Sequence, residues 1–228
     1  KKKEWLKLAK ELSPRLKPAK SLTGILEGIK MAEYMDEMEA LYYQKAGYEA
    51  EKGSFRKVMD QFYLDMQMAD TKEEIKNGYQ KGKSEMNRLE IQIPERPIRI
   101  GVVGEYFTVM DAHANQHLQE KLSSLGASVY RYMSVTNCHF RAKETALRPK
   151  ISEYVKFNMG PTTTWTVNSA LDYAKQGFDG IVHVKSFGCT PEIDAVPVLQ
   201  NISRDFHIPV LYLSYDTQNS DTGLDTRL

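Results

Sequence analysis

Apolar residues in the first part of the chain, residues 1–92, recur at the spacing of α-helices, with few signs of strands. Thr71 and Glu74 have the spacing of a capping box, which predicts that a helix begins after Thr71. We expect a helical region over residues 1–92 that forms part of a larger domain. Two apolar stripes step by three and four positions, as one face of a helix does: Leu22, Ile25, Leu26, Ile29, Ala32 and Met35, and then Phe55, Val58, Met59, Phe62, Tyr63 and Met66.

At Ile93-Pro-Glu-Arg-Pro97 the pattern changes, because two prolines end the helical spacing and favour an extended segment. Short apolar runs then alternate with helical stretches, which is typical of a parallel sheet with helices on both faces. The sequence therefore predicts an α/β protein, in which the helical N-terminal region precedes a doubly wound four-stranded parallel sheet in a Rossmann-like domain (93–228). The expected strands are residues 98–103, 128–133, 179–185 and 209–214, and the expected helices are residues 113–125, 143–158, 165–176 and 191–206.

Composition and charge narrow the class of protein. Of the 228 residues, 41% are hydrophobic and 27% are charged, and the formal net charge is +1. These values fit a folded domain and give no reason to expect nucleic-acid binding. The apolar runs fall far short of the roughly 18 residues that cross a membrane. Two cysteines are too few for a disulfide-stapled secreted domain, so we expect a reducing, cytoplasmic location.

Both ends of the chain suggest a piece of a longer protein. The first residue is Lys1 rather than Met, and no apolar segment of a signal peptide follows the basic start. The last residues, which end at Leu228, look like the first turn of a helix. We therefore expect a fragment.

Ligands of open parallel sheets bind outside the carboxyl ends of the strands. Gly104 and Glu105 follow the first expected strand, Cys138 the second, Cys189 the third and Asp216 the fourth. If the strand order is 2-1-3-4, the two cysteines lie on strands that flank the first strand, at one edge of the sheet. We assign Gly104 and Glu105 to cofactor binding.

Cys189 is the strongest candidate for chemistry. It comes shortly before Pro191, a residue type that is favoured in the first turn of a helix. A thiol at the N-terminus of a helix is expected to lose its proton more readily, and metal binding or nucleophilic attack requires the thiolate. The alternative is a buried structural cysteine, a common role of a free thiol. Cys138 lacks such a sequence context.

Three further patterns are weaker. Gly101 and Gly104 resemble part of a dinucleotide-binding loop but lack its third glycine. His113 and His117 lie four apart on one expected helix, as in zinc proteases, without the glutamate between them. The hydroxyls of Pro161-Thr-Thr-Thr164 could hold a phosphate, although the last threonine more readily caps the helix that follows.

Four segments carry a resemblance to a known family. They are Gly177-Phe-Asp-Gly-Ile-Val-His-Val-Lys-Ser-Phe-Gly-Cys-Thr-Pro-Glu192, Ile100-Gly-Val-Val-Gly-Glu105, Asn115 with Leu125-Gly126, and Ile208-Pro-Val-Leu-Tyr-Leu-Ser-Tyr-Asp216 followed by Gly223-Leu-Asp-Thr-Arg-Leu228. The chain thereby resembles the 2-hydroxyacyl-CoA dehydratase and benzoyl-CoA reductase superfamily, in the branch related to CoA-enzyme activases. The resemblance covers residues 93–228 and departs from the family at Ser186, where a proline is usual.

The resemblance implies an oxygen-sensitive iron–sulfur protein of anaerobic metabolism, which works as a homo- or heterodimer. Members hold a [4Fe–4S] or related cluster, receive a low-potential electron from an ATP-dependent activator on the same or a separate chain, and pass it to an acyl-CoA. By position, Cys189 would be the third cluster cysteine, so the cluster is expected in the full-length protein and not in this fragment. Glu192 and Asp216 would be the catalytic or site-lining groups that set the hydrogen bonds around the cluster.

Two other interpretations stay open. The chain could be a cluster-free binding or scaffold domain, in which the helical region, with seven of the ten methionines, docks a partner. It could also be a small domain that binds a nucleotide or CoA without redox chemistry.

Overall fold

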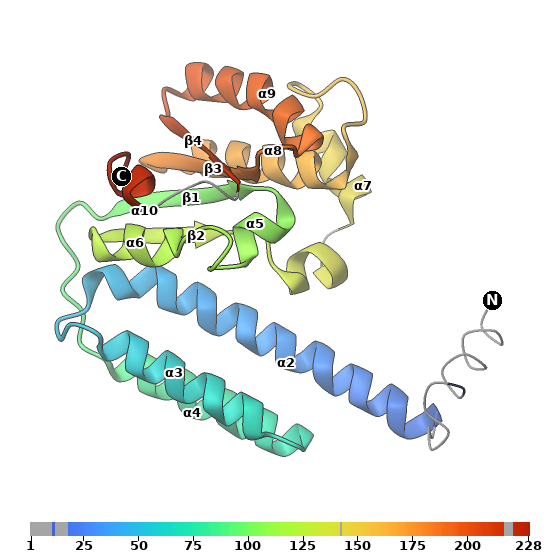
Figure 1. Ribbon diagram of the computed structural model, residues 1–228, viewed down its shortest axis with the longest axis vertical. Helices are drawn as coiled ribbons and strands as arrows, with labels where there is room; N and C mark the ends of the chain where they lie inside the picture. Colours follow the sequence, from blue (N-terminus) through green and yellow to red (C-terminus); the bar gives the residue numbers. More distant parts are fainter. Residues whose placement is uncertain (1–10, 12–17, 142, 217–220) are drawn as a thin grey trace.

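The computed structural model describes residue 11 and residues 18–141, 143–216 and 221–228. In the described part of the helical region, three α-helices pack together (Figure 1), and a β-bridge between Glu49 and Ile91 joins the connection after α2 to the segment after α4. Thr71 caps α4 in a complete capping box, as the sequence predicts, because its side chain accepts from the N–H of Glu74 and the Glu74 side chain accepts from the N–H of Thr71. The helices are α2 (Pro18–Lys45), α3 (Ser54–Met68) and α4 (Lys72–Arg88).

Methionine and aromatic side chains fill the core between these helices. The second predicted stripe is confirmed, because α3 buries four of its six members against α2 and α4. The first stripe divides along α2: Met35 packs against this core and Ile29 and Ala32 are partly buried, whereas Leu22, Ile25 and Leu26 are 58–60% exposed. The N-terminal end of α2, where this stripe begins, projects beyond α3 and α4 (Figure 1). The buried core residues are Met38, Phe55, Met59, Phe62, Met66, Ile75, Tyr79 and Met86.

The rest of the chain forms the predicted doubly wound sheet. All four strands are parallel, which confirms the fold class, and their order β2-β1-β3-β4 is the one assumed above in placing the two cysteines. Helices α8 (Gly160–Lys175) and α9 (Thr190–Phe206) cover one face, and α6 (Leu118–Ser124) lies on the other. The strands are β1 (Ile98–Gly104), β2 (Ala127–Arg131), β3 (Gly180–Ser186) and β4 (Val210–Tyr215), and α10 (Asp221–Asp225) follows β4.

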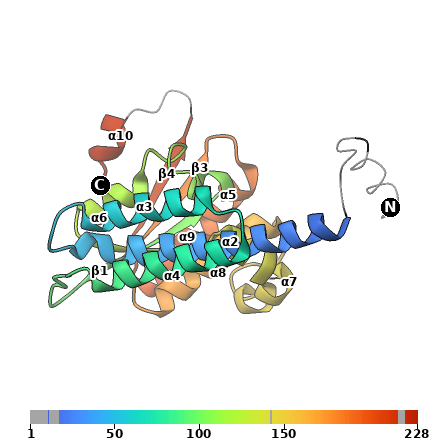
Figure 2. The ribbon, with the colours of Figure 1, turned by 90° about the horizontal axis from the view of Figure 1, so that it is seen from below.

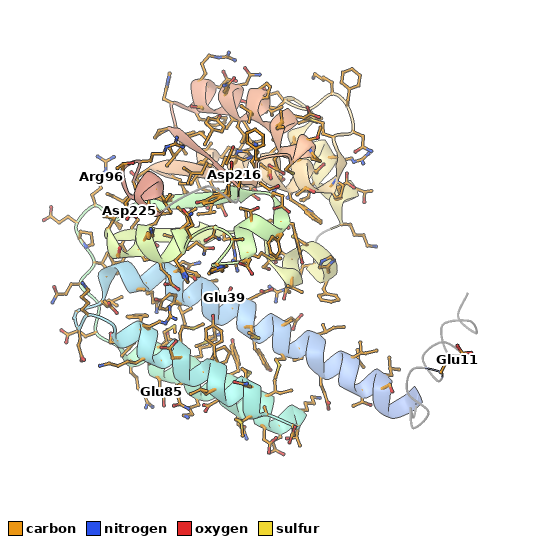
Figure 3. All side chains as sticks on the ribbon, viewed as in Figure 1. Glu11, Glu39, Glu85, Arg96, Asp216 and Asp225 are labelled. Carbon is orange, nitrogen blue, oxygen red and sulfur yellow. The ribbon has the colours of Figure 1, made fainter. Side chains whose placement is uncertain are left out.

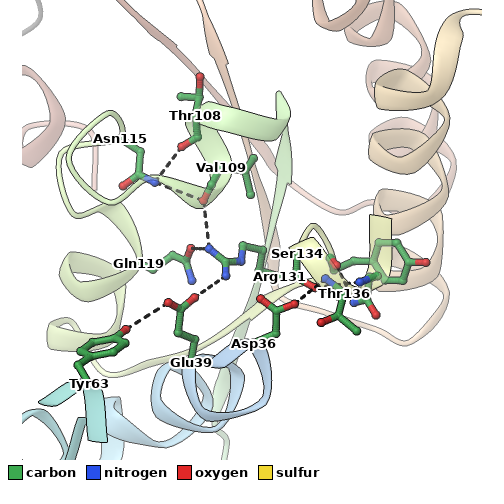
Figure 4. Close-up of polar contacts among 12 residues, drawn as sticks. Asp36, Glu39, Tyr63, Thr108, Val109, Asn115, Gln119, Arg131, Ser134 and Thr136 are labelled. Carbon is green, nitrogen blue, oxygen red and sulfur yellow. Dashed lines mark hydrogen bonds and ion pairs between the residues drawn. The ribbon is translucent and has the colours of Figure 1, made fainter. Parts of the chain in front are cut away.

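The helical region lies against the β2 edge of the sheet, with α2 nearest to it (Figures 1 and 2). Side chains lie between α2 and the domain, and Glu39 is among them (Figure 3). The Arg131 guanidinium donates to Oε2 of Glu39 at 2.7 Å, and the Tyr63 hydroxyl donates to its Oε1 at 3.1 Å (Figure 4). Asp36 accepts from the N–H of Thr136 at 2.7 Å. Polar groups of α2 therefore fix the edge strand.

Two predicted helices are much shorter in the structure than the sequence indicated. The helix expected over 113–125 begins only at Leu118, and a short helix, α5 (Tyr106–Met110), precedes it. His113 therefore lies in turns ahead of α6, and His117 adopts left-handed backbone angles as its N-cap, so the two histidines do not share a helix. The helix expected over 143–158 is only α7 (Glu144–Leu147) and a 3₁₀ turn, η3 (Arg148–Ile151), because Pro149 cannot donate to the helical ladder.

Helix α8 begins five residues before its predicted start, at Gly160. Thr164 therefore lies inside the helix, and its hydroxyl donates to the carbonyl of Gly160 at 2.8 Å instead of capping. Among the described helices, none has the length and apolar content needed to cross a membrane.

Candidate functional site

The carboxyl ends of β1 and β3 meet at the switch point of the sheet, because the chain leaves β1 toward β2 on one side and continues to β3 on the other. The contact is close at Gly104, where a Cβ atom would lie 1.8 Å from the carbonyl oxygen of Val184. Gly104 also has a φ of +138°, which side chains rarely adopt. Packing of β1 on β3 thus requires this glycine, and Gly101 is required by the ring of Tyr173, which a Cβ would meet at 2.2 Å.

Glu105, which we expected to bind a cofactor, caps helix α5. Its carboxylate accepts from the N–H groups of Phe107 and Thr108, both at 2.9 Å, and from the Thr108 hydroxyl. Its own N–H donates to the carbonyl of Val184 at 2.9 Å, which continues the contact between β1 and β3. The carboxylate therefore has a structural role in this arrangement.

Cys189 is the N-cap residue of α9, as the sequence predicts, and its thiol is free and partly exposed. The prediction that its position favours the thiolate was wrong. Burial raises the pKa of the Cys189 thiol, and the backbone N–H of Glu192 offsets only part of this effect. The negative charges of Glu192 and Glu105 raise the pKa further, whereas the ammonium of Lys185 lowers it. Cys189, Glu105 and Glu192 are thus brought together, with Lys185 beside them.

Glu192 lies one helical turn after Cys189 and is fully buried. Its Oε2 lies 2.8 Å from Nε2 of His183, and its Oε1 accepts from the Thr166 hydroxyl at 3.1 Å. His183 is on β3 and is 1% exposed, and Thr166 is on α8 and is also buried. Two roles were predicted for Glu192: lining an open site, or supporting the ligand residue Cys189 from inside the protein. Its complete burial is compatible with the second role and not with the first.

His183, Thr166 and Lys185 were not singled out from the sequence. One signal was available for His183 and Lys185, because both interrupt the apolar run from Ile181 to Lys185 in a strand that had to be buried. Lys185 is nine-tenths buried, and its ammonium donates to the carbonyl of Phe187 at 3.1 Å. For Thr166 the sequence offers no signal beyond a polar residue on an otherwise buried helix face.

Cys138 and Asp216 follow the other two strands, β2 and β4. Cys138 is buried in η2 (Asn137–Arg141), where its Sγ lies 3.5 Å from Sδ of Met133, and burial raises its pKa to about 11. Asp216 is exposed at the end of β4. The carboxylates that act on the Cys189 thiol are those of Glu192 and Glu105.

Comparison with known proteins adds no family to this description. No protein-family model matches the chain. A search of curated proteins found no significant match either.

The donor set can be tested against the iron–sulfur cluster that the resemblance implies. A cluster needs several thiolates, and within the described residues no group of three or more His, Cys, Asp or Glu side chains is placed to hold a metal ion. Cys189 alone offers sulfur at the switch point, since Cys138 is enclosed by Met133 and apolar neighbours. The described residues therefore fit one ligand of a cluster and not a whole binding site.

Proposed function

We propose that this chain is the part of an iron–sulfur 2-hydroxyacyl-CoA dehydratase- or reductase-like protein that supplies Cys189 as one ligand of the cluster. The observation that carries the proposal is the place of this thiol. It is partly exposed, it belongs to the N-cap residue of a 17-residue helix, and it lies at the switch point where parallel sheets bind ligands. The surrounding segment Phe187-Gly188-Cys189-Thr190-Pro191-Glu192 is the core of the resemblance.

Four residues of the chain would then have distinct roles at the site. Cys189 would bind iron as a thiolate, and the metal would displace the proton that burial otherwise retains. The Lys185 ammonium would offset the negative charge of the thiolate. Glu192 would support the first turn of α9 from inside the protein. Asp216, exposed at the end of β4, would face the acyl-CoA side of the site.

The rest of the proposal concerns the whole protein. A bound cluster would supply single low-potential electrons, delivered by an ATP-dependent activator in the cytoplasm. The remaining thiolates would come from polypeptide other than the described residues.

The test is the iron and acid-labile sulfide content of the full-length polypeptide, isolated without oxygen from its natural host. We compare the wild-type protein with Cys189→Ala and use Cys138→Ala as the matched control. The proposal expects Cys189→Ala to lose most of its iron and Cys138→Ala to keep it. Equal iron in all three proteins would exclude Cys189 as a ligand, and a wild-type protein without iron would exclude the cluster.

A second candidate, a cluster-free binding domain, is favoured by a separate observation. Burial raises the pKa of Cys189, which makes the free thiol a poorer ligand and nucleophile than its position alone suggests. In that case Cys189 is a helix-capping residue, and the wild-type protein isolated as above contains no iron.

A further inference from the structure

The buried polar groups beneath Cys189 come from four different elements. Glu192 is in the first turn of α9, His183 is on β3 and Thr166 is on α8. The Thr166 hydroxyl lies 3.1 Å from Oε1 of Glu192 and 3.2 Å from the carbonyl oxygen of Gly104, the last residue of β1. One threonine hydroxyl thus lies between the end of β1 and the start of α9.

A second threonine of α8 contacts the same turn. The Thr163 hydroxyl donates to the carbonyl of Pro191 at 2.7 Å. Thr163 and Thr166 are three positions apart, so they lie on one face of α8. Both are fully buried. Two consecutive residues of α9, Pro191 and Glu192, are therefore held by two hydroxyls of a neighbouring helix.

These contacts are an unexpected way to stabilise a core. Burying an acid beside a histidine carries a desolvation cost, and well-packed apolar residues of similar volume often give equal or greater stability. The same face of the sheet is otherwise covered by apolar side chains. Hydrogen bonds, however, fix direction and register, which apolar contacts do less strictly. These buried hydrogen bonds are therefore what we expect where the turn that begins with Cys189 must be held in one position.

We propose that Thr163, Thr166, His183 and Glu192 are positioning residues, which hold the first turn of α9 so that the Sγ of Cys189 keeps a fixed place at the switch point. This inference deepens the proposed function, because it concerns the geometry of the thiol that would bind iron. It does not need the metal to be tested, since it predicts a property of the free thiol.

The two cysteines allow the test to be made within one sample. Alkylation by iodoacetamide is followed for Cys189 and Cys138 separately, by mass spectrometry of their peptides, in the iron-free polypeptide. Cys189 reports the turn of α9, and Cys138, buried after β2, reports loosening of the whole domain. Because both thiols are in the same molecules, unfolding raises both rates, whereas loss of positioning raises that of Cys189 alone.

Thr166→Val removes one hydroxyl at constant volume, and Thr166→Ser restores it as the matched control. We expect Thr166→Val to raise the Cys189 rate about fivefold, the effect of losing one hydrogen bond. In Thr166→Ser, the rate should return to near the wild-type value. The double variant His183→Leu/Glu192→Met replaces the buried pair by apolar residues, and it should keep the Cys138 rate while raising that of Cys189. Because loss of the Glu192 charge also lowers the pKa of the Cys189 thiol, this rate is measured as a function of pH and compared per thiolate.

Two results would overturn the inference. One is an unchanged Cys189 rate in Thr166→Val and in the folded double variant. The other is a parallel rise at Cys138, which would show that these buried hydrogen bonds serve only the stability of the domain. Neither result depends on iron. A wild-type protein without iron would therefore remove the proposed function while leaving the positioning inference to be decided by the alkylation rates.

Discussion

The loops that follow β2 and β3 each carry one of the chain's two cysteines, but one thiol is buried and the other is partly exposed. After β2, Cys138 lies inside an apolar cluster, and its Sγ lies 3.5 Å from Sδ of Met133. After β3, Cys189 begins a long helix, is partly exposed and lies within the influence of three charged side chains. Both strands flank β1 and end at the same edge of the sheet.

The difference shows that the edge of a sheet does not by itself make a site. Burial raises the pKa of both thiols. What separates them is the support beneath each turn. The Cys138 thiol packs among apolar side chains, and the hydrogen bonds of its turn are made earlier in the turn, at Thr136 and Asn137. The first turn of α9 instead accepts hydrogen bonds at Pro191 and Glu192 from buried hydroxyls of α8. Each prediction below changes one side of this comparison.

The largest effect is expected from breaking the buried pair on the Cys189 side. Glu192→Leu leaves the buried His183 without its partner, and we expect a loss of about 3–5 kcal/mol in the free energy of unfolding, measured with denaturant. The double variant His183→Leu/Glu192→Met replaces both buried polar side chains and should recover most of this loss. A single variant as stable as the wild type would show that the pair contributes little.

The next effect concerns the strand contact that leads to the Cys189 loop. Gly104→Ala forces a Cβ to within 1.8 Å of the Val184 carbonyl at a φ of +138°. We expect a destabilisation of about 2–4 kcal/mol from backbone strain and overlap. Gly126→Ala is the matched control, because Gly126 also has positive φ (+84°) but no atom within 4 Å of the added Cβ. It should cost about 1 kcal/mol, and equal losses in the two variants would contradict the role of the contact.

Most of the sheet could be predicted from the sequence, because its strands are apolar runs bounded by glycine and proline. The strand order entered only as a condition, which the structure meets. The errors have local causes. Glu105 looked like a ligand, so the helix that it caps was missed, and the helical spacing after residue 143 concealed the effect of Pro149. Leu22, Ile25 and Leu26 show the opposite error, since helical periodicity gives a face and does not reveal what covers it.

The candidate site was predicted less completely. Cys189 could be placed at a helix start, because Pro191 is a local signal for the first turn. Whether the pKa of its thiol is raised or lowered could not be predicted, since burial depends on contacts between elements that are distant in the sequence. The contact of Glu192 with His183 and Thr166 joins α9 to β3 and α8, and no spacing rule within one element predicts it. The lone histidine in a buried strand was the one clue available.

A smaller effect separates the two cysteines directly. Cys138→Ala leaves a small cavity beside Met133, and we expect a loss of about 1 kcal/mol in the free energy of unfolding. Cys189→Ala removes a partly exposed side chain and should change that value by less than about 0.5 kcal/mol. Denaturant curves measured for both variants in iron-free protein test this difference. If Cys189→Ala were the more damaging change, the thiol of Cys189 would itself be a structural group.

The smallest effect is a difference in pH dependence. Burial raises the pKa of Cys138 from 9.0 to about 11. Between these values the unfolded chain loses the thiol proton while the folded protein keeps it, so rising pH favours the unfolded state and stability falls. Below about pH 9 both states keep the proton, and the contribution is constant.

Cys138→Ala should therefore lose stability less steeply than the wild type as the pH rises from 9 to 11. Buried tyrosines such as Tyr215, whose pKa burial raises to about 12, reduce stability over an overlapping range in both proteins, so the difference between the two curves isolates Cys138. Cys189→Ala is the control: its thiol is less buried, and its curve should lie closer to the wild type. Parallel curves for Cys138→Ala and the wild type would mean that the Cys138 thiol is as accessible to water as that of Cys189, and the contrast between the two loops would fail.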